Sequence, residues 1–305
     1  MNVLKRILHQ IEKNVCKIRV GEEQATGFFC KIPFPDLNNM LSVLITVDFI
    51  FEDTILYNKD QKISLYIMDE NDIKILDLND RIIYTNRDFS TAIIEIKETD
   101  HINYFLELDN LIIKDILYNE NTNREFIDET LYTIQYGGNE LSSSYGILDK
   151  INNDKKYKFI HKCSTRAGAS GSPMLNLNNK VIGIHTEGYI HKYNKGTFLN
   201  YPIKEFININ VKQNNEKLLK EFNKKYNLDI NDFNITKLNL SRKFAGNELL
   251  KNLSKLKFNE LKELYLYDND ISEIKDFQKI NFEKLEILDL CNNNISDIKL
   301  FEKIN

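Results

Sequence analysis

The sequence lacks the long apolar runs and the one-sided charge that mark membrane proteins and nucleic-acid-binding proteins. No apolar run in the 305 residues reaches the roughly 18 residues that a membrane-spanning helix needs. Lysine and arginine number 41 against 45 aspartates and glutamates, which leaves a formal net charge of -4. This balance gives no electrostatic reason to bind nucleic acid or an anionic membrane. We therefore expect neither nucleic acid nor a membrane among the partners.

Cysteine is also scarce, occurring only as Cys16, Cys30, Cys163 and Cys291. The spacing matches no metal-ligand pattern and no disulfide framework, so we interpret these residues as small buried apolar side chains. A chain without a disulfide framework suits a reducing compartment better than a secretory one. The sequence therefore predicts an intracellular, cytoplasmic protein. Because no metal or nucleotide motif is present, it also predicts no metal site and no cofactor.

The N-terminal residues mix charge with apolar side chains. Lys5, Arg6, Glu12 and Lys13 interrupt the apolar core that a signal peptide requires. The spacing instead predicts a short amphipathic helix over residues 1–13. A length of 305 residues then allows about two further domains, each with its own core.

Residues 14–207 consist mainly of short segments that read as strands. Turns rich in Asn, Asp and Gly separate them, and such a series predicts an antiparallel sandwich or barrel. The predicted strands cover residues 15–20, 25–32, 41–46, 63–68, 73–76, 92–96, 130–135, 144–148, 157–161, 181–185 and 197–201. We therefore expect this domain to be mainly β.

One loop within this domain has the composition of a nucleophile site. In Gly168-Ala169-Ser170-Gly171-Ser172-Pro173, small residues surround a single serine. Such a loop can present the hydroxyl together with backbone N–H groups that stabilise a developing oxyanion. The stretch resembles the Gly-x-Ser-Gly-Gly/Ser-Pro loop of trypsin/chymotrypsin-like serine proteases. The resemblance extends over residues 14–207 and implies a double six-stranded β-barrel, with Ser170 in the nucleophile position and the N–H groups of Gly168 and Ser170 as the oxyanion hole.

The other two triad positions depart from the family pattern. The family's histidine follows a strand in a Leu-Thr-x-x-His stretch, and the matching residues place Phe49 there. The family's aspartate opens a later strand, and Ser90 stands in its place. Asp88, two residues earlier, is a candidate displaced acid. Loss of the base lowers the turnover of a serine protease by about a million-fold, so the resemblance implies a protease fold without its general base.

The predicted substrate pocket lies around the serine loop. By resemblance, Ser164 lies at its base and His185, Thr186 and Gly188 form its wall, within a Gly-Ile-His stretch similar to that of glutamyl endopeptidases. That resemblance implies that His185 senses an acidic side chain, and the alternative is a buried histidine bonded to the backbone. Glu187 departs from the pattern, because a carboxylate beside the pocket repels an acidic ligand.

The remainder of the chain contains a helical linker and a repeat. Residues 208–232 include apolar residues at helical spacing from Glu216 to Tyr226. Residues 233–305 then repeat a Leu-x-x-Leu-x-Leu-x-x-Asn-x-Ile pattern from Leu261 and again from Leu285, with a looser copy from Ile235. The pattern is that of leucine-rich repeats and predicts a short α/β solenoid of about three repeats, or part of a longer array. Tyr265 and Tyr267 are candidate contact residues on the exposed strand face.

The function that these patterns favour is a serine endopeptidase homologue that has lost activity and binds protein or peptide partners through its cleft and its repeats. The alternative is an active trypsin-like endopeptidase that uses an unrecognised base, such as Asp88 or a histidine brought in by a loop, while the repeats recruit substrate. The histidines available are His9, His101, His161, His185 and His191. We expect none of them to occupy the first-barrel position opposite Ser170.

Overall fold

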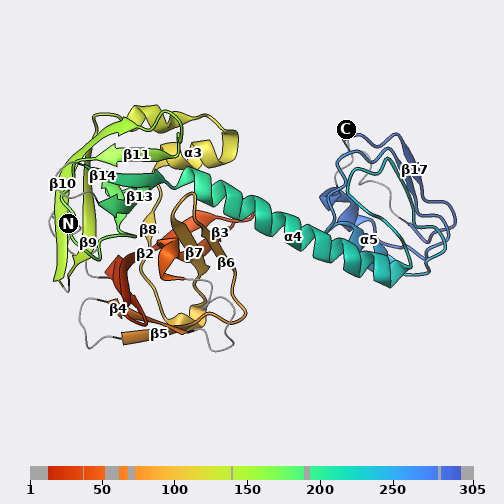
Figure 1. Ribbon diagram of the computed structural model, residues 1–305. Coiled ribbons are helices and arrows are strands. Elements are labelled where there is room, and N and C mark those ends of the chain that lie inside the picture. The colour runs from red at the N-terminus through yellow and green to blue at the C-terminus, as the bar shows by residue number, and fades with distance from the viewer. Residues whose placement is uncertain are drawn as a thin grey trace. The chain divides into compact units, whose positions relative to one another are not determined.

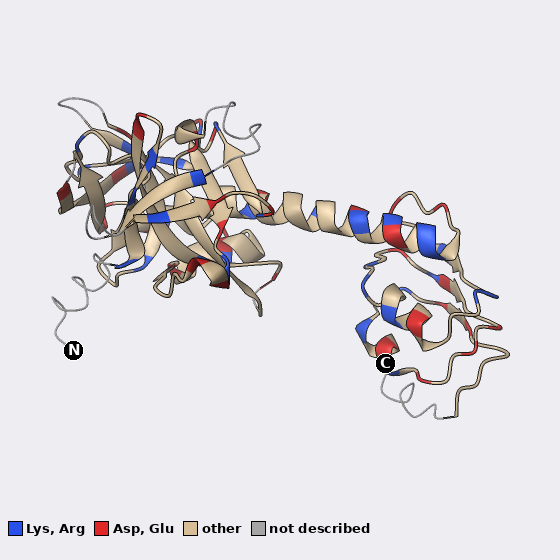
Figure 2. Ribbon diagram, turned by 90° about the horizontal axis from the view of Figure 1, so that it is seen from below, with Lys and Arg blue, Asp and Glu red and all other residues tan. Residues whose placement is uncertain are grey.

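The computed structural model describes residues 13–36, 38–51, 62–67, 73–138, 140–188, 193–280 and 283–296. The chain divides into two compact units, Met1–Asn208 and Ile209–Asn305. The helix expected over residues 1–13 falls almost wholly outside the described residues. Acidic and basic residues are interspersed over each unit in the view of Figure 2. No helix in the described part of the chain is both long and apolar enough to cross a membrane.

The first unit begins with a curled antiparallel sheet of short strands. Its path runs β5-β4-β1-β2-β3-β7-β6, and β8 adds to β2. The strands are β1 (Val15–Val20), β2 (Glu23–Pro33), β3 (Met40–Thr46), β4 (Lys62–Ile67), β5 (Ile73–Asp77), β6 (Ile83–Asn86), β7 (Thr91–Glu95) and β8 (Leu106–Glu107). The two ends of the path, β5 and β6, are consecutive in the chain, and residues 78–82 join them.

This first sheet differs in detail from the six-stranded barrel that the sequence predicts. Among the described residues no ladder of hydrogen bonds joins β5 to β6. The cause is local, because the Asp77 carboxylate accepts the Asn79 N–H at 2.9 Å and Asp80 takes a positive φ of 54°. Short polar side chains that bond the backbone two residues ahead favour turns over strands. One barrel strand is therefore split into β5 and β6.

The second half of the unit is a closed six-stranded barrel, with the order β10-β11-β14-β13-β12-β9 (Figure 1). Its strands are β9 (Thr130–Gly137), β10 (Glu140–Ile151), β11 (Lys158–His161), β12 (Pro173–Asn176), β13 (Val181–Gly188) and β14 (Asn194–Phe198). The connection from the first sheet contains helix α3 (Asn110–Tyr118), which Asp109 caps by accepting the Leu111 N–H at 2.8 Å, and a 3-10 turn at Thr122–Phe126. The mainly β, trypsin-like fold that the sequence predicts is confirmed.

One continuous apolar core links the sheet and the barrel. Phe28 and Ile45 of the sheet and Phe159 and Phe198 of the barrel belong to a single cluster of buried side chains. Gly196 makes room for Phe159, since a Cβ at that glycine would lie 2.3 Å from the phenyl ring. Close packing of this kind leaves no space for even one added methyl group. The core therefore holds the two halves of the unit in one fixed arrangement.

Helix α4 (Asn200–Tyr226) is longer than the sequence predicts. The sequence predicts a short helix at the end of the barrel, after residues 201–206, and a separate one from Glu216 to Tyr226, yet residues 207–215 contain no Gly or Pro that would divide them. Pro202 lies in the first turn, where its missing N–H has no helical partner to lose. Within the first unit, Phe206 is fully buried against Phe34 and Tyr84, with ring centroids 5.3 and 6.1 Å away.

The second unit contains three short parallel strands, β15 (Lys237–Asn239), β16 (Glu263–Tyr265) and β17 (Ile287–Asp289). The register places Leu238, Leu264 and Leu288 side by side. The offsets are 26 and 24 residues, which is why the first copy of the repeat looks irregular in the sequence. Helix α5 (Asn247–Leu253) and a 3-10 turn at Lys275–Lys279 lie between the strands.

The repeated asparagines satisfy backbone groups at the turns. The Asn269 side chain is fully buried, and its Nδ2 donates to the carbonyls of Leu240 and Leu266 at 2.8 and 2.9 Å. Its Oδ1 accepts the Lys243 N–H at 2.8 Å. Asn293 repeats this role, with Nδ2 bonds of 2.9 Å to the carbonyls of Leu266 and Leu290. Buried backbone groups need such partners.

Candidate functional site

The Ser170 loop joins β11 to β12 and is held in place by hydrogen bonds from both halves of the first unit. Thr26 of β2 is the centre of these contacts. Its N–H donates to the Ser170 carbonyl at 2.9 Å, and its hydroxyl donates to the Gly168 carbonyl at 2.9 Å. The same hydroxyl accepts the Tyr136 N–H of β9 at 3.0 Å. A single buried threonine therefore ties the first sheet, the barrel and the loop together.

The glycines of the loop are required by its backbone geometry. Gly168 and Gly171 have positive φ values of 90° and 93°. A Cβ at Gly171 would lie 1.9 Å from the Thr26 carbonyl oxygen. The Gly171 N–H donates to the His185 carbonyl at 2.8 Å, and the His185 N–H donates to the Ser172 carbonyl at 2.9 Å. The loop is thus bonded on its other side to β13.

The Ser170 hydroxyl donates to a backbone carbonyl and not to a base. Its Oγ lies 3.2 Å from the Thr186 carbonyl oxygen. Among the described residues, no imidazole or carboxylate is hydrogen-bonded to Ser170. The N–H groups of Gly168 and Ser170 have no hydrogen-bond acceptor in the described part of the chain. Gly168 and Ser170 both line a cavity, so these two donors remain available for a ligand.

The residues in the predicted histidine and aspartate positions lie on the first sheet. Phe49 lies in a 3-10 turn, Asp48–Ile50, directly after β3, and its side chain is 43% exposed. Ser90 has a positive φ of 52° and lies in the turn between β6 and β7, not on the strand itself. Asp88, proposed as a displaced acid on that strand, is exposed in the same turn, because β6 already ends at Asn86.

The buried side chain of Lys158 contacts Ser90. The Lys158 Nζ donates to the Ser90 Oγ at 3.1 Å and lies 3.6 Å from a carboxylate oxygen of Glu187. Burial lowers the pKa of Lys158, against the opposing effect of Glu187. Burial also raises the pKa of the Asp48 carboxyl, against the effects of Arg87 and Lys158. The Lys158 cation therefore lies beside the position at which trypsin/chymotrypsin-like serine proteases have the triad aspartate.

Glu187 is neutralised by two lysines. Its carboxylate pairs with Lys195 at 2.9 Å as well as with Lys158, and the two lysines help to hold its pKa below the usual value, against partial burial. The sequence predicts a carboxylate that repels acidic ligands from the pocket, whereas the Glu187 carboxylate is paired with two lysines. The strand bulges between His185 and Glu187, which turns these two side chains out of the regular alternation.

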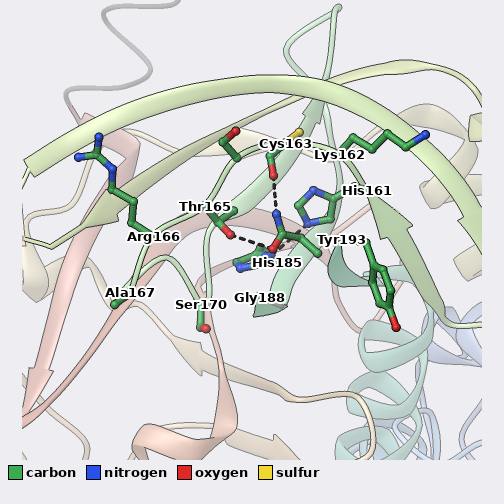
Figure 3. A pocket seen from close by; sticks show the side chains of 13 residues that line it. His161, Lys162, Cys163, Thr165, Arg166, Ala167, Ser170, His185, Gly188 and Tyr193 are labelled. Atoms are coloured by element: carbon green, nitrogen blue, oxygen red, sulfur yellow. Dashed lines mark hydrogen bonds between the residues drawn. The ribbon is translucent and has the colours of Figure 1, made fainter. Parts of the chain in front are cut away.

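A cavity of about 690 Å³ opens beside Ser170 (Figure 3). Of the predicted pocket residues, Ser164, His185 and Gly188 line it. Thr186 does not line the cavity. Its side chain is buried and its hydroxyl donates to the Lys195 carbonyl at 3.3 Å, while its own carbonyl accepts from Ser170. The roles of these residues in binding stay predictions.

Two histidines are in contact at the buried end of this cavity. The His161 Nε2 and the His185 Nδ1 are 3.1 Å apart, and the rings meet edge to face. Burial lowers the pKa of His161 to about 3 and that of His185 to about 4. Both imidazoles are therefore neutral near pH 7. The alternative that His185 is a buried histidine is consistent with its 2% exposure, although its ring also lines the cavity.

The remaining histidines and the cysteines do not add to the site. His101 ends a short 3-10 turn at Glu98–Asp100, whereas His9 and His191 lie outside the described residues. The four cysteines are free, and all except Cys291 are buried. Within the described residues, no group of three or more His, Cys, Asp or Glu side chains is placed to hold a metal.

Sequence reasoning missed Thr26, Lys158 and His161 as parts of the site. Thr26 lies within the predicted strand over residues 25–32, and nothing in its spacing indicates hydrogen bonds to residues 136–170. Lys158 and His161 are on β11, whose pairing with β14 brings them next to Glu187 and His185. Such contacts depend on barrel closure and cannot be read from local patterns.

Models of known protein families match two separate parts of the chain. The family model described as "Trypsin-like peptidase domain" matches residues 65–184, and the model described as "Leucine Rich repeats (2 copies)" matches residues 259–303. A glutamyl endopeptidase of Staphylococcus epidermidis is 26% identical over 120 residues, which are 39% of this chain and 41% of that protein. A glutamyl endopeptidase of Staphylococcus aureus (strain MRSA252) is 27% identical over 104 residues, 34% of this chain and 29% of that protein.

Solved serine protease structures are also similar to the chain. The serine endoprotease from Yersinia pestis has a TM-score of 0.47 at 12% identity and covers 68% of this chain and 67% of its own. Rv3671c from M. tuberculosis H37Rv, in an inactive form, has a TM-score of 0.46 at 13% identity and covers 67% of this chain and 91% of its own. The chain spans less than half the length of the curated relatives that it matches.

Proposed function

We propose that this chain, a trypsin-like peptidase domain followed by leucine-rich repeats, is a catalytically inactive protease homologue that binds peptides in the Ser170 cleft and a protein partner through its repeats. The observation that carries the proposal is the hydrogen bond from Ser170 to the Thr186 carbonyl. A carbonyl oxygen cannot remove the hydroxyl proton, and a serine without a base is a weak nucleophile at neutral pH.

At the two triad positions of the first sheet, the described residues carry no replacement for the missing base. Phe49 has no group that accepts a proton, and Ser90 accepts a hydrogen bond from the Lys158 cation. A cation at this place would oppose the imidazolium that a histidine forms during catalysis, whereas a triad aspartate stabilises it. The exposed Asp88 lacks a histidine to orient, so the alternative of an active enzyme with a displaced acid has little support.

The cleft nevertheless retains the means to hold a peptide. The N–H groups of Gly168 and Ser170 can donate to a peptide carbonyl, since neither has an acceptor among the described residues. The cavity lined by Ser164, His185 and Gly188 can take the side chain of the same residue. Oxyanion-hole donors and pocket contacts bind substrate even where the triad is absent.

The experiment that tests this proposal compares the chain with a Ser170→Ala variant. Both are titrated with fluorescent peptides, and hydrolysis of the same peptides is followed by mass spectrometry. The proposal predicts equal affinities, within about threefold, because the hydroxyl contributes one exposed hydrogen bond at most. It also predicts no cleavage by either protein. Cleavage by the unaltered chain that disappears in the variant would establish the active-enzyme alternative.

For the repeats, the proposed contact surface is the strand face around the half-buried Tyr265 and Tyr267. The two rings are held by cations, with the Lys237 Nζ 4.7 Å from the Tyr265 ring centroid and the Arg242 guanidinium 5.1 Å from that of Tyr267. Leucine-rich repeats commonly bind proteins, and ordered aromatic residues often dominate such interfaces. A variant with both tyrosines changed to alanine should lose the partner that co-purifies with the unaltered chain, whereas Ser170→Ala should keep it.

A further inference from the structure

The first unit has a second cavity, on a part of the barrel that the Ser170 cleft does not use. It has a volume of about 430 Å³ and lies between the 3-10 turn Thr122–Phe126 and the hairpin that joins β10 to β11. None of the described residues that line it also lines the cavity beside Ser170. A volume of this size is within the range of about 300–1,000 Å³ that is typical of small-molecule sites.

Three cationic side chains line this second cavity. They belong to Arg124 of the 3-10 turn, Lys150 near the end of β10 and Lys156 of the hairpin. All three residues are exposed, and none of them forms an ion pair with another described residue. Like charges gathered around one cavity repel one another, so an anion placed there is attracted by all three.

The acidic residues close to these cations in the sequence do not cancel their charge within the cavity. Asp149 precedes Lys150 but is paired with Lys162 at 2.7 Å. Glu125 and Asp154 are exposed, and neither lines the cavity. Among the described residues, therefore, no carboxylate lines it. The cavity is locally positive, although the whole chain has a formal net charge of -4.

Hydrogen bonds fix the backbone of both walls. On the side of the 3-10 turn, the Asn121 N–H donates to the Asp115 carboxylate at 2.9 Å. In the hairpin, the Asn152 Oδ1 accepts the Lys155 N–H at 2.9 Å, and the Asn152 N–H donates to the Lys158 carbonyl at 2.9 Å. The walls are thus ordered before a ligand arrives, which reduces the conformational entropy that binding costs.

Two isoleucines add an apolar surface to the same cavity. Ile127 is 38% exposed, and Ile151, the last residue of β10, is half-buried. Covering such side chains removes apolar area from water and favours binding. An inorganic anion could contact the cations alone, whereas an organic anion could also cover the isoleucines. The lining of the cavity therefore suits an anion that has an apolar part.

We infer that this cavity binds a small organic phosphate, with its phosphate group held by Arg124, Lys150 and Lys156 and its carbon skeleton lying on the two isoleucines. A phosphate monoester carries a charge of about -1.5 to -2 at pH 7, which three cations match better than they match the single charge of a carboxylate. A guanidinium can also donate to two phosphate oxygens at once. This site is separate from the Ser170 cleft and does not depend on the proposed function.

The test titrates the full chain with three probes, phenyl phosphate, benzoate and inorganic phosphate, by calorimetry at pH 7.5 (about neutral) and constant ionic strength. Benzoate keeps the aromatic ring but has only one charge, and inorganic phosphate lacks the ring. We expect phenyl phosphate to bind at least about tenfold more tightly than either of the others, because each of them lacks one of the two kinds of contact.

Substitutions then locate the site. Arg124→Gln and Lys150→Gln should each weaken the binding of phenyl phosphate by about tenfold. Lys155→Gln is the matched control, because Lys155 is exposed in the same hairpin and carries the same charge but does not line the cavity. It should change the affinity by less than about twofold, since an exposed charge outside the cavity is screened.

The outcomes that would overturn the inference are distinct. An equal loss in the Lys155→Gln and Arg124→Gln variants would show only diffuse attraction to a basic surface. Binding of benzoate or inorganic phosphate as tight as that of phenyl phosphate, or no binding of phenyl phosphate, would also contradict it. The comparison of probes uses the unaltered chain, so it does not depend on the folding of a variant. None of these results bears on peptide binding beside Ser170.

Discussion

The Ser170 loop in the barrel and the two triad positions in the first sheet differ in how many other residues depend on them. Backbone groups of residues 168–172 are bonded to Thr26 of the first sheet and to His185 of the pocket wall. Phe49, in contrast, is 43% exposed after the end of a strand, and Ser90 is in a turn. The loop therefore contributes to the stability of the fold whether or not it takes part in catalysis. The positions of the base and the acid contribute little to stability and matter mainly for catalysis.

This difference explains why a nucleophile loop can persist in a chain that lacks a base. Changing the loop disturbs contacts between the sheet, the barrel and the pocket. Changing the other two positions alters an exposed side chain and a turn. A well-formed serine loop is consequently weak support for catalysis unless the base and acid are present too. The four predictions below test this contrast, from the largest expected effect to the smallest.

Gly171→Ala should be the most damaging change. The new Cβ would lie 1.9 Å from the Thr26 carbonyl oxygen, and φ is 93°. We expect a loss of about 4 kcal/mol or more in the free energy of unfolding, or no folded protein. Gly21→Ala is the matched control, because Gly21 also has a positive φ of 59° but no atom within 4 Å of its added Cβ. Urea denaturation measures both, and equal losses would show that the loop is not tightly packed.

Thr26→Val should weaken the tie between the sheet and the loop. The change leaves the Gly168 carbonyl and the Tyr136 N–H without their partner and costs about 2–4 kcal/mol of unfolding free energy. Thr133→Val is the control, since Thr133 is equally buried but its hydroxyl has no hydrogen-bond partner. That control should be neutral or stabilising in the same denaturation experiment. A similar loss in both variants would contradict the role given to Thr26.

Restoring the triad should need three substitutions. In a Phe49→His and Ser90→Asp variant, Lys158 would pair with the new carboxylate and weaken its hold on the histidine. Adding Lys158→Met should then raise peptide hydrolysis by about 100-fold over the double variant, a typical contribution of a general base. Glu187 keeps Lys195 as its partner, so the third change does not leave Glu187 unpaired.

Lys195→Met in place of Lys158→Met is the matched control for that experiment. It removes the other lysine of Glu187 without vacating the space beside residue 90. No gain with Lys158→Met, or an equal gain with Lys195→Met, would mean that the alignment of Phe49 and Ser90 with the triad positions is wrong.

The histidine pair should make the first unit sensitive to acid. The pKa values of His161 and His185 are about 3 and 4 in the folded chain, against 6.5 for an unperturbed histidine. The unfolded state therefore binds more protons between about pH 6.5 and pH 4, and stability falls as the pH falls through this range. From pH 7 to pH 5 we expect a loss of about 2 kcal/mol for each histidine. His161→Phe should remove about half of that loss, and an unchanged pH dependence would contradict the burial of the pair.

Features that local sequence patterns encode could be predicted, whereas contacts that depend on strand pairing could not. Local patterns identified most of the strands, the Ser170 loop and the repeat register, since alternation and phased asparagines are short-range signals. They missed β6, β8 and β12, and they extended the last barrel strand to residue 201, where helix α4 has already begun. They identified Phe49 and Ser90 through their place beside strands. The split between β5 and β6 follows from the hydrogen bond between the Asp77 carboxylate and the Asn79 N–H, and the continuous helix α4 follows from the absence of Gly and Pro in residues 207–215. Both features are local, but the periodicity of apolar residues does not record them. Lys158 and His161 entered the site only through strand pairing across the closed barrel.

The central claim is that Ser170 is not an activated nucleophile. Its direct test is the rate at which a fluorophosphonate probe labels the purified chain, measured beside a trypsin-like protease with an intact triad and beside the Ser170→Ala variant. We predict labelling no faster than that of the variant, because the hydroxyl proton is directed at the Thr186 carbonyl and no described base is bonded to it. Rapid labelling that is lost in Ser170→Ala would contradict the account and identify the chain as an active serine hydrolase.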